Sequence, residues 1–239
     1  MEKFELIPFL DSITLAHTVA GNWLDEVKRA AQKGGRHSVA LAGGRITRWF
    51  LEAAAELAKA RGVTFEHVDF FWGDERCVPP TDGDSNFALA ENYLLKKISV
   101  PQKNIHRIRG EENPAKAVQQ AEVELRQFVK KNSEKLPVLE VIFLGMGEDG
   151  HVASLFPSES QETRSNKAVY RAVVGPKPPP NRVTLGYSTI AAAKEVWVLA
   201  SGEGKKDALR ESISPKGQTP LSQVIQMRPH TKLFSDVRV

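Results

Sequence analysis

The sequence predicts an α/β fold in which helices cover both faces of a mostly parallel β-sheet. Short apolar runs alternate along the chain with segments whose apolar residues recur at helical spacing, and parallel strands joined by helices bury both kinds of segment. The clearest run, residues 141–144, has four apolar residues without polar alternation, as expected of a strand covered on both faces. Three such runs end in glycine turns, and open α/β sheets bind ligands at these strand ends.

The first half of the chain alternates helix and strand. Residues 12–33 show helical apolar spacing behind Ser12, which we expect to cap the helix, and the pattern stops at Gly34 and Gly35. The other elements expected here are a buried strand at 37–42, a helix at 47–61, a strand at 68–72, a proline-rich loop at 73–80, and a helix from 85–86 to about 97.

The second half continues this alternation around the strand at 141–144. A proline in the first turn marks a helix at 114–132. The other elements expected here are a strand at 169–174, a rigid proline-rich connection at 175–180, a strand at 182–185, a short helix at 190–193, a strand at 196–200, a helix running through 209–212, and a last edge strand at 232–234.

Glycine turns follow three of the predicted strands, at residues 43–44, 145–150 and 202–204. Because the carboxyl ends of parallel strands share one edge of a sheet, the three turns should meet there. No internal repeat, low-complexity tract or linker divides the chain. We therefore expect a single domain over residues 1–239.

The composition favours a small anionic ligand. The formal charge is +4, and the lysines and arginines are spread along the 239 residues, so neither nucleic acid nor a membrane is an expected partner. The single cysteine, Cys77, excludes an internal disulfide, and nothing in the sequence would activate it as a nucleophile. No apolar stretch has membrane-spanning length and the first residues lack a signal-peptide pattern, so a cytoplasmic protein is expected.

The turn at 145–150 carries the strongest candidates for chemistry. Asp149 and His151 lie two residues apart, where a glycine turn leaves a buried strand. Asp149 could instead only cap a helix that opens near Val152. The other histidines lack such a setting, and we expect a structural or solvent-facing place for His17, His37, His67, His106 and His230.

The other two glycine turns supply candidate anion ligands. Gly43 and Gly44 precede a helix, whose free N–H groups and dipole suit a phosphate. Arg45, Arg182 and Lys205 are candidate cationic ligands, although each alone could be a solvated surface charge. Neither a dinucleotide fingerprint nor a P-loop is present, so no nicotinamide or ATP, and no other cofactor, is expected.

A charged cluster of Asp74, Glu75 and Arg76 follows the predicted strand at 68–72. These residues suit contacts to sugar hydroxyls and to a developing oxyanion, or alternatively a surface ion-pair network. A metal site that combines the two acids with Asp149 and His151 lacks the usual ligand spacing, so no metal is expected.

These residues stand in stretches that resemble a known family almost from end to end. The most specific stretch is 145–157, Gly-Met-Gly-Glu-Asp-Gly-His-Val-Ala-Ser-Leu-Phe-Pro, and the supporting stretches are 72–79, 85–86, 179–185 and 202–205. They are similar to the 6-phosphogluconolactonase branch of the family that also includes the glucosamine-6-phosphate isomerases/deaminases.

The resemblance implies a Rossmann-like sheet and the cofactor-free hydrolysis of 6-phospho-D-glucono-1,5-lactone to 6-phosphogluconate, a step of the oxidative pentose phosphate pathway. The expected partner is then a small-molecule sugar-phosphate lactone, and the expected state a monomer or weak homodimer. Carried over by position, the implied roles are general base for His151, a place beside it for Asp149, contact with the lactone carbonyl for Arg76, and phosphate binding for Arg182, Lys205, Gly43 and Gly44. A neutral imidazole near pH 7 is a competent base for water.

One stretch departs from the resemblance. Where the family usually has Ser-Gly-Gly-Ser-Thr-Pro, this chain has Ala-Gly-Gly-Arg-Ile-Thr at 42–47, so two hydroxyls that would contact phosphate are missing. Arg45 either offers a charged fork in their place or obstructs the pocket. The phosphate affinity and the substrate range therefore stay open.

Two other functions also stay open. A deaminase or isomerase would use Asp74 to move a proton between sugar carbons, but that branch carries a glutamate just before the proline of the motif, where this chain has Phe156. A non-catalytic sugar-phosphate sensor would have no need of a base, so the pair of Asp149 and His151 argues against it.

Overall fold

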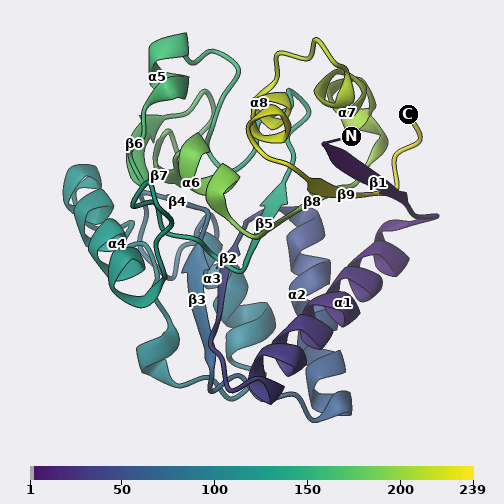
Figure 1. The fold of residues 1–239 in the computed structure, drawn as a ribbon, viewed down its shortest axis with the longest axis vertical. Helices are drawn as coiled ribbons and strands as arrows, with labels where there is room; N and C mark the ends of the chain where they lie inside the picture. Colours follow the sequence, from purple (N-terminus) through teal and green to yellow (C-terminus); the bar gives the residue numbers. More distant parts are fainter. Residues whose placement is uncertain (1–2) are drawn as a thin grey trace.

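The computed structural model describes residues 3–239 and shows an α/β fold built on a six-stranded sheet (Figure 1). All neighbouring strands of this sheet pair in parallel. In spatial order the strands are β1 (Phe4–Pro8), β9 (Thr231–Ser235), β8 (Glu195–Ala200), β5 (Val141–Gly145), β2 (His37–Leu41) and β3 (Val68–Trp72). The predicted fold class is confirmed, and β2, β5 and β8, which carry the glycine turns, are neighbours.

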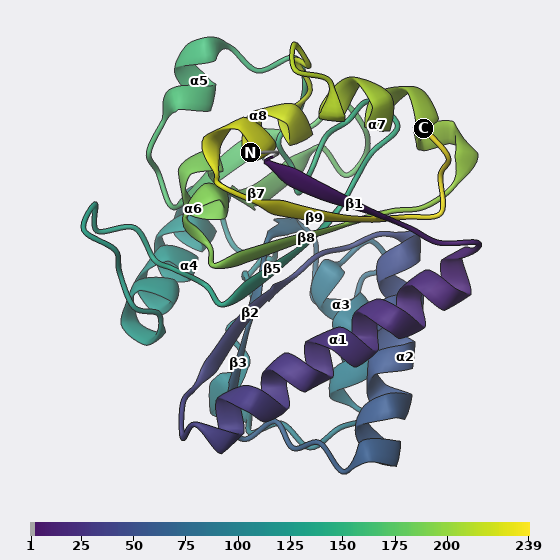
Figure 2. The ribbon, with the colours of Figure 1, turned by 45° about the vertical axis from the view of Figure 1, so that its right-hand side comes forward.

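Helices cover both faces of this sheet. α1 (Ser12–Gln32) and α2 (Arg45–Arg61) pack on each other on one side, and Figure 2 shows α6 (Tyr187–Ala192), α7 (Lys206–Ile213) and α8 (Pro220–Met227) on the other. The cap of α1 is Asp11 rather than the expected Ser12, since the Asp11 carboxylate accepts a hydrogen bond from the Thr14 N–H at 2.7 Å. No helix within residues 3–239 has the length and apolar character that crossing a membrane requires.

The core is held together by aromatic side chains from helices and strands. Trp23 of α1 is fully buried and lies 5.7 Å from Phe50 of α2, 6.2 Å from Phe70 of β3 and 5.8 Å from Phe143 of β5, measured between ring centroids. Such tilted and edge-to-face pairs add to the apolar area that each ring buries. The buried side chains form one continuous cluster, which supports the prediction of a single domain.

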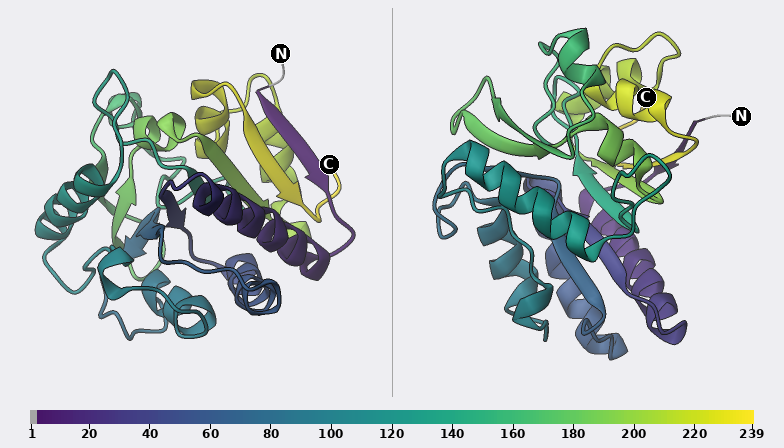
Figure 3. Two further views of the ribbon diagram at one scale, coloured as in Figure 1. Left: turned by 60° about the horizontal axis from the view of Figure 1, so that its bottom comes forward. Right: turned by 60° about the vertical axis from the view of Figure 1, so that its left-hand side comes forward.

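A second, antiparallel sheet was not predicted. It contains β4 (Asp74–Arg76), β7 (Asn181–Leu185) and β6 (Tyr170–Val174), and α4 (Pro114–Phe128) packs against β6 and β7 (Figure 3). The prediction of a loop throughout 73–80 is therefore wrong for Asp74–Arg76. Prolines are tolerated next to β4 because it is a three-residue edge strand and Pro79 and Pro80 lie beyond its end.

Other expectations also need correction. Residues 232–234 belong to β9, which is internal rather than at an edge because β1 pairs with it, Leu6 opposite Leu233. The helix expected from 85–86 to 97 is α3 (Asn86–Ala90), capped by Ser85 as predicted, followed by the π-helical turn η1 (Glu91–Leu95). Neither α5 (Gln161–Ser165) nor α8 was predicted.

A polar network of Arg36, Asp69, His106 and Glu124 joins β3 to α4. Arg36 donates to Asp69 of β3, with 2.6 Å from Nε to Oδ2, and His106 lies between Asp69 at 3.5 Å and Glu124 of α4 at 3.2 Å. Burial alone would lower the pKa of His106. The two carboxylates outweigh burial and raise the pKa of this imidazole above its ordinary value.

This network predicts that the free energy of unfolding decreases as the pH rises above neutral. Because the pKa of His106 is higher in the folded state, its contribution is fully present below the unfolded value of about 6.5 and is lost as the pH rises through the folded value. We expect His106→Gln to remove this part of the pH dependence of the melting temperature between pH 6 and pH 9. His17→Gln, at an exposed histidine of α1, serves as the control. A His106→Gln variant with the full wild-type slope would contradict the prediction.

Candidate active site

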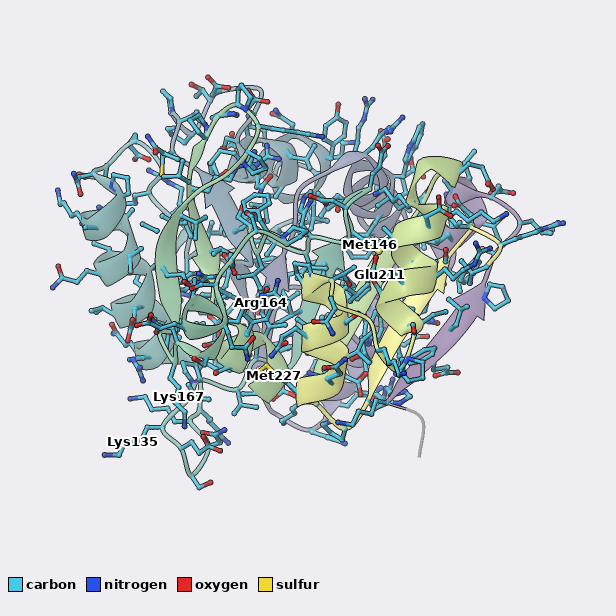
Figure 4. All side chains as sticks on the ribbon, turned by 90° about the horizontal axis from the view of Figure 1, so that it is seen from above. Lys135, Met146, Arg164, Lys167, Glu211 and Met227 are labelled. Carbon is cyan, nitrogen blue, oxygen red and sulfur yellow. The ribbon has the colours of Figure 1, made fainter. Side chains whose placement is uncertain are left out.

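The three glycine turns meet at the carboxyl edge of the parallel sheet, as predicted. One pocket is lined by residues from these turns and from the small sheet: Ala42, Gly43, Gly44, Arg45, Ile46, Asp74, Arg76, Asn86, Gly145, Met146, Gly147, His151, Ala153, Arg182 and Lys205. Figure 4 looks onto the molecule from above and labels Met146, which follows β5. Of the candidate site residues predicted from the sequence, Asp149 and Glu75 do not line the pocket, and Asp149 lies in contact with His151.

Asp149 and His151 form a hydrogen-bonded pair. Nδ1 of His151 lies 2.5 Å from Oδ1 of Asp149, and the His151 backbone N–H donates to the same oxygen at 3.1 Å. Partial burial alone would raise the pKa of Asp149, but the hydrogen bonds from His151 outweigh it and lower that pKa. A carboxylate only accepts, so in the neutral imidazole Nδ1 carries the proton and Nε2 has the free lone pair.

The alternative role for Asp149, as the cap of a helix near Val152, is wrong. The chain from Gly150 to Pro157 forms turns and isolated bridges rather than a helix. Phe156 completes the surroundings of the imidazole, with ring centroids 5.2 Å apart. His151 is therefore oriented by a carboxylate and by an aromatic ring, while its side chain stays 30% exposed at the pocket.

The amino end of α2 opens into the same pocket. Gly44 is the N-cap residue, and its backbone has φ = 100°, a value that residues other than glycine rarely adopt. No side chain caps the helix. The first N–H groups of a helix have no intrahelical partners. Thr47 uses its hydroxyl to donate to the Gly43 carbonyl at 2.7 Å, so it does not cover these groups. The helix thus presents free donors to an anion.

Cations surround this helix end and use backbone carbonyls as their partners. Arg182 donates to the carbonyls of Pro179 and Lys177, at 3.0 and 3.2 Å, and Lys205 donates to the Met146 carbonyl. Burial and the neighbouring Arg45 lower the pKa of Lys205. Burial and the neighbouring Arg76 likewise lower the pKa of Arg182. These shifts show that positive charge is crowded and partly desolvated here, which an anion would offset.

Arg76 and Arg182 stand opposite each other in the small sheet. They are register partners in the antiparallel pair of β4 and β7, and both line the pocket. Arg76 donates from Nη1 to the Asp84 carbonyl at 2.6 Å. The guanidinium of Arg182 lies over the Phe156 ring, 5.7 Å from its centroid, so Phe156 contacts both a cationic ligand and the imidazole of His151.

Glu75 does not line the pocket, although its neighbours Asp74 and Arg76 do. Successive side chains of a strand point to opposite faces, so Glu75 points away. Its carboxylate accepts from the Ser85 hydroxyl and from the backbone N–H groups of Arg76, Asn86 and Phe87, while burial raises the pKa of Glu75 to about 7. In the part of the chain that the structure describes, no three His, Cys, Asp or Glu side chains gather as metal ligands.

Two polar residues that hold Asp74 were not predicted as parts of the site. Asn86 was expected only as part of a helix cap, but its amide donates to Oδ1 of Asp74 at 3.1 Å. Ser154 was expected only as part of a motif, but its hydroxyl donates to Oδ2 of Asp74 at 2.6 Å. The five other histidines do not line the pocket, and His37, for example, accepts from the Trp23 indole in the core.

Comparison with known proteins identifies the family. The model for glucosamine-6-phosphate isomerases/6-phosphogluconolactonase matches residues 11–234. A 6-phosphogluconolactonase of Streptomyces coelicolor is 32% identical over 220 residues, which are 90% of this chain and 84% of the relative. The structure of a 6-phosphogluconolactonase from Trypanosoma brucei has a TM-score of 0.84 at 26% identity, over 98% of this chain and 97% of the other.

The same fold also occurs in the other branch. A monomeric glucosamine-6-phosphate deaminase has a TM-score of 0.81 at 16% identity, over 97% of both chains, so the fold alone does not separate the two activities. The family model likewise covers both branches, whereas the relative from Streptomyces coelicolor is a lactonase. The chain belongs to the glucosamine-6-phosphate isomerase/6-phosphogluconolactonase family.

Proposed function

We propose that this protein hydrolyses 6-phospho-D-glucono-1,5-lactone to 6-phosphogluconate, with His151 as the general base. The observation that carries the proposal is the Asp149 and His151 pair, which presents an oriented imidazole to a pocket that the uncapped amino end of α2 also lines. The lactonase names of relatives at about a third sequence identity support the choice of reaction.

In the proposed reaction His151 works through Nε2. This nitrogen takes a proton from a water molecule as the water oxygen attacks the lactone carbonyl carbon. Asp149 accepts from Nδ1–H and stabilises the imidazolium that forms. When the tetrahedral intermediate collapses, the bond from the carbonyl carbon to the ring oxygen breaks, and the imidazolium returns its proton to that oxygen. The base is thereby regenerated and the ring opens to the acid.

The charge that builds on the carbonyl oxygen needs a donor in place before the reaction. Arg76 lines the pocket from β4 and uses one of its donors on the Asp84 carbonyl, which fixes its direction. A fixed cationic donor is more effective than water because it does not have to reorganise as charge develops. We assign Arg76 to the carbonyl oxygen.

The phosphate is assigned to the opposite end of the pocket. The turn of Gly43 and Gly44 supplies backbone N–H groups, and Arg182 and Lys205 supply charge. Arg45 takes the place of the hydroxyls that the family usually has here and adds a third cation. Holding the phosphate in the pocket that His151 also lines orients the lactone carbonyl toward the base.

Two assays on the wild-type protein separate this proposal from the deaminase. In the first, formation of 6-phosphogluconate from freshly generated lactone is followed with its dehydrogenase and compared with a no-enzyme blank, because the lactone also opens spontaneously. In the second, ammonia release from glucosamine 6-phosphate is followed. We expect a catalysed excess only in the first. Ammonia release without lactone turnover would overturn the proposal.

Gly147 provides the sharpest test of the geometry of the Asp149 and His151 pair. A Cβ atom at this position would lie 2.1 Å from Nδ1 of His151 and 2.6 Å from Oδ1 of Asp149. Gly147→Ala must therefore displace the imidazole from its present position, and we expect kcat for the lactone to fall about 100-fold, the scale of a misplaced catalytic group. Gly83→Ala is the matched control, because its Cβ would meet no atom within 4 Å. Wild-type kcat in Gly147→Ala would contradict the catalytic role of the Asp149 and His151 pair.

A further inference from the structure

Ser154 fastens the loop that carries His151 to the small sheet. The residue is fully buried, and its backbone N–H donates to the Thr184 hydroxyl at 3.2 Å while its own hydroxyl donates to Oδ2 of Asp74 at 2.6 Å. Asp74 and Thr184 are register partners in the pair of β4 and β7. Both hydrogen-bond partners of Ser154 therefore lie at the same register position of the small sheet.

Asp74 is a buried acid held from two sides. It is 5% exposed, its Oδ2 accepts from Ser154, and its Oδ1 accepts from the Asn86 amide at 3.1 Å. Both donors are neutral. A carboxylate offers about four acceptor positions, and these contacts use two of them. Because Asp74 also lines the pocket, its remaining acceptor positions are available to a ligand hydroxyl there.

The strand geometry indicates which hydroxyl this is. Asp74 and Arg76 are two residues apart on β4, so their side chains leave the same face of the strand. Arg76 is the residue proposed to meet the lactone carbonyl oxygen at C1. The hydroxyl nearest to that carbonyl is the one on C2, which places it beside Asp74.

We propose that Ser154 is a positioning residue that holds Asp74 as the acceptor for the C2 hydroxyl of the substrate. The inference rests on the proposed function for the choice of ligand, and on the hydrogen bonds of Ser154 and Asn86 for the geometry. It also gives Asp74 a task different from proton transfer between carbons. A carboxylate fixed by two donors binds a hydroxyl in one orientation and discriminates against ligands that lack it.

The test compares ligands with and without this hydroxyl in wild type, Ser154→Ala and Ser154→Thr. Calorimetry gives the Kd of 6-phosphogluconate and of its 2-deoxy analogue, and the coupled assay gives KM and kcat for the two lactones. In wild type we expect the 2-deoxy acid to bind about 10- to 100-fold more weakly, the scale of a hydrogen bond to a charged group. Ser154→Ala should bring this ratio to within about 3-fold of unity, acting on KM more than on kcat, and Ser154→Thr should restore it.

Ser212→Ala is the matched control. Ser212 is also a buried serine, and its hydroxyl donates to the Ala208 carbonyl in α7, away from the pocket. We expect this variant to keep the wild-type preference for the C2 hydroxyl. Melting temperatures of all variants show whether a loss of binding reflects loss of the fold.

Several outcomes would overturn the inference. If Ser154→Ala weakens the binding of both acids by the same factor, Ser154 makes only a structural contact. If wild type binds the two acids equally, Asp74 does not bind the C2 hydroxyl. If wild type prefers the C2 hydroxyl through Ser154 but does not hydrolyse the lactone, the proposed function fails and the positioning role stands. If wild type binds neither acid, both fail.

Discussion

Replacing His151 by asparagine is expected to lower kcat for lactone hydrolysis about 1,000-fold, within the range of 100- to 10,000-fold that a positioned general base contributes. Asparagine keeps a polar side chain of similar reach but cannot take up a proton near pH 7. The ligands assigned to the phosphate lie on other segments, from α2, β7 and the turn after β8, so KM should change by less than about 3-fold. Steady-state kinetics with the coupled assay measures both quantities.

The partner residue gives this prediction its internal control. Asp149→Asn should also lower kcat, though by less than His151→Asn, since the amide can still contact the ring but no longer stabilises the imidazolium. The double variant should be no slower than His151→Asn alone, because the two residues act as a unit. His230→Asn, at an exposed histidine outside the pocket, should keep wild-type kcat. A His151→Asn variant that retains more than a tenth of wild-type kcat would refute the base assignment.

Replacing Lys205 by methionine is expected to lower kcat/KM about 100-fold, mainly through KM. Lys205 lies in the pocket with its ammonium against the Met146 carbonyl, and burial together with the neighbouring Arg45 lowers its pKa. A phosphate oxygen in contact with this ammonium makes a charge-assisted hydrogen bond, whose loss weakens binding on that scale. Methionine preserves the length and apolar stem of the side chain, so the fold should be retained.

A substitution of the neighbouring Arg45 shows whether this residue binds the phosphate or obstructs the pocket. Arg45→Ser restores the residue that the family usually has, and we expect KM to rise about 10-fold because a cation is lost from the pocket. Arg48→Ser is the matched control on the same helix, since Arg48 lies over the Tyr93 ring and does not line the pocket. A lower KM in Arg45→Ser would show that Arg45 obstructs the site, and an unchanged KM in Lys205→Met would remove Lys205 from the phosphate site.

The parallel sheet could be predicted because its central strands are buried on both faces. β5 appears in the sequence as a continuous apolar run, and β2 and β3 as short segments in which apolar residues predominate. The glycine turns after β2, β5 and β8 mark one edge of the sheet. The edge strand β1 could not be predicted, since its five residues are only partly buried and its pairing partner β9 lies more than 220 positions later. Such a pairing depends on tertiary structure rather than on local pattern.

The same distinction holds for the site. His151, Asp149, Arg45 and Lys205 follow strands directly and could be located from the turns. The hydrogen bond from Ser154 to Asp74 joins residues 80 positions apart, and it exists only because β4 and β7 pair beside the motif. Burial and partner geometry of this kind are properties of the folded chain, so no spacing rule could have shown them.

The most direct measurement of the central claim is the catalysed excess of 6-phosphogluconate formation over the blank for wild type, for His151→Ala, and for His151→Ala with added imidazole, each against a blank of the same buffer. We expect a clear excess for wild type and none for His151→Ala. We also expect free imidazole to restore part of the excess in proportion to its unprotonated concentration, because it replaces the missing base. A wild-type rate equal to the blank would contradict lactone hydrolysis by this protein, and a His151→Ala rate equal to wild type would contradict the role of His151 as the base.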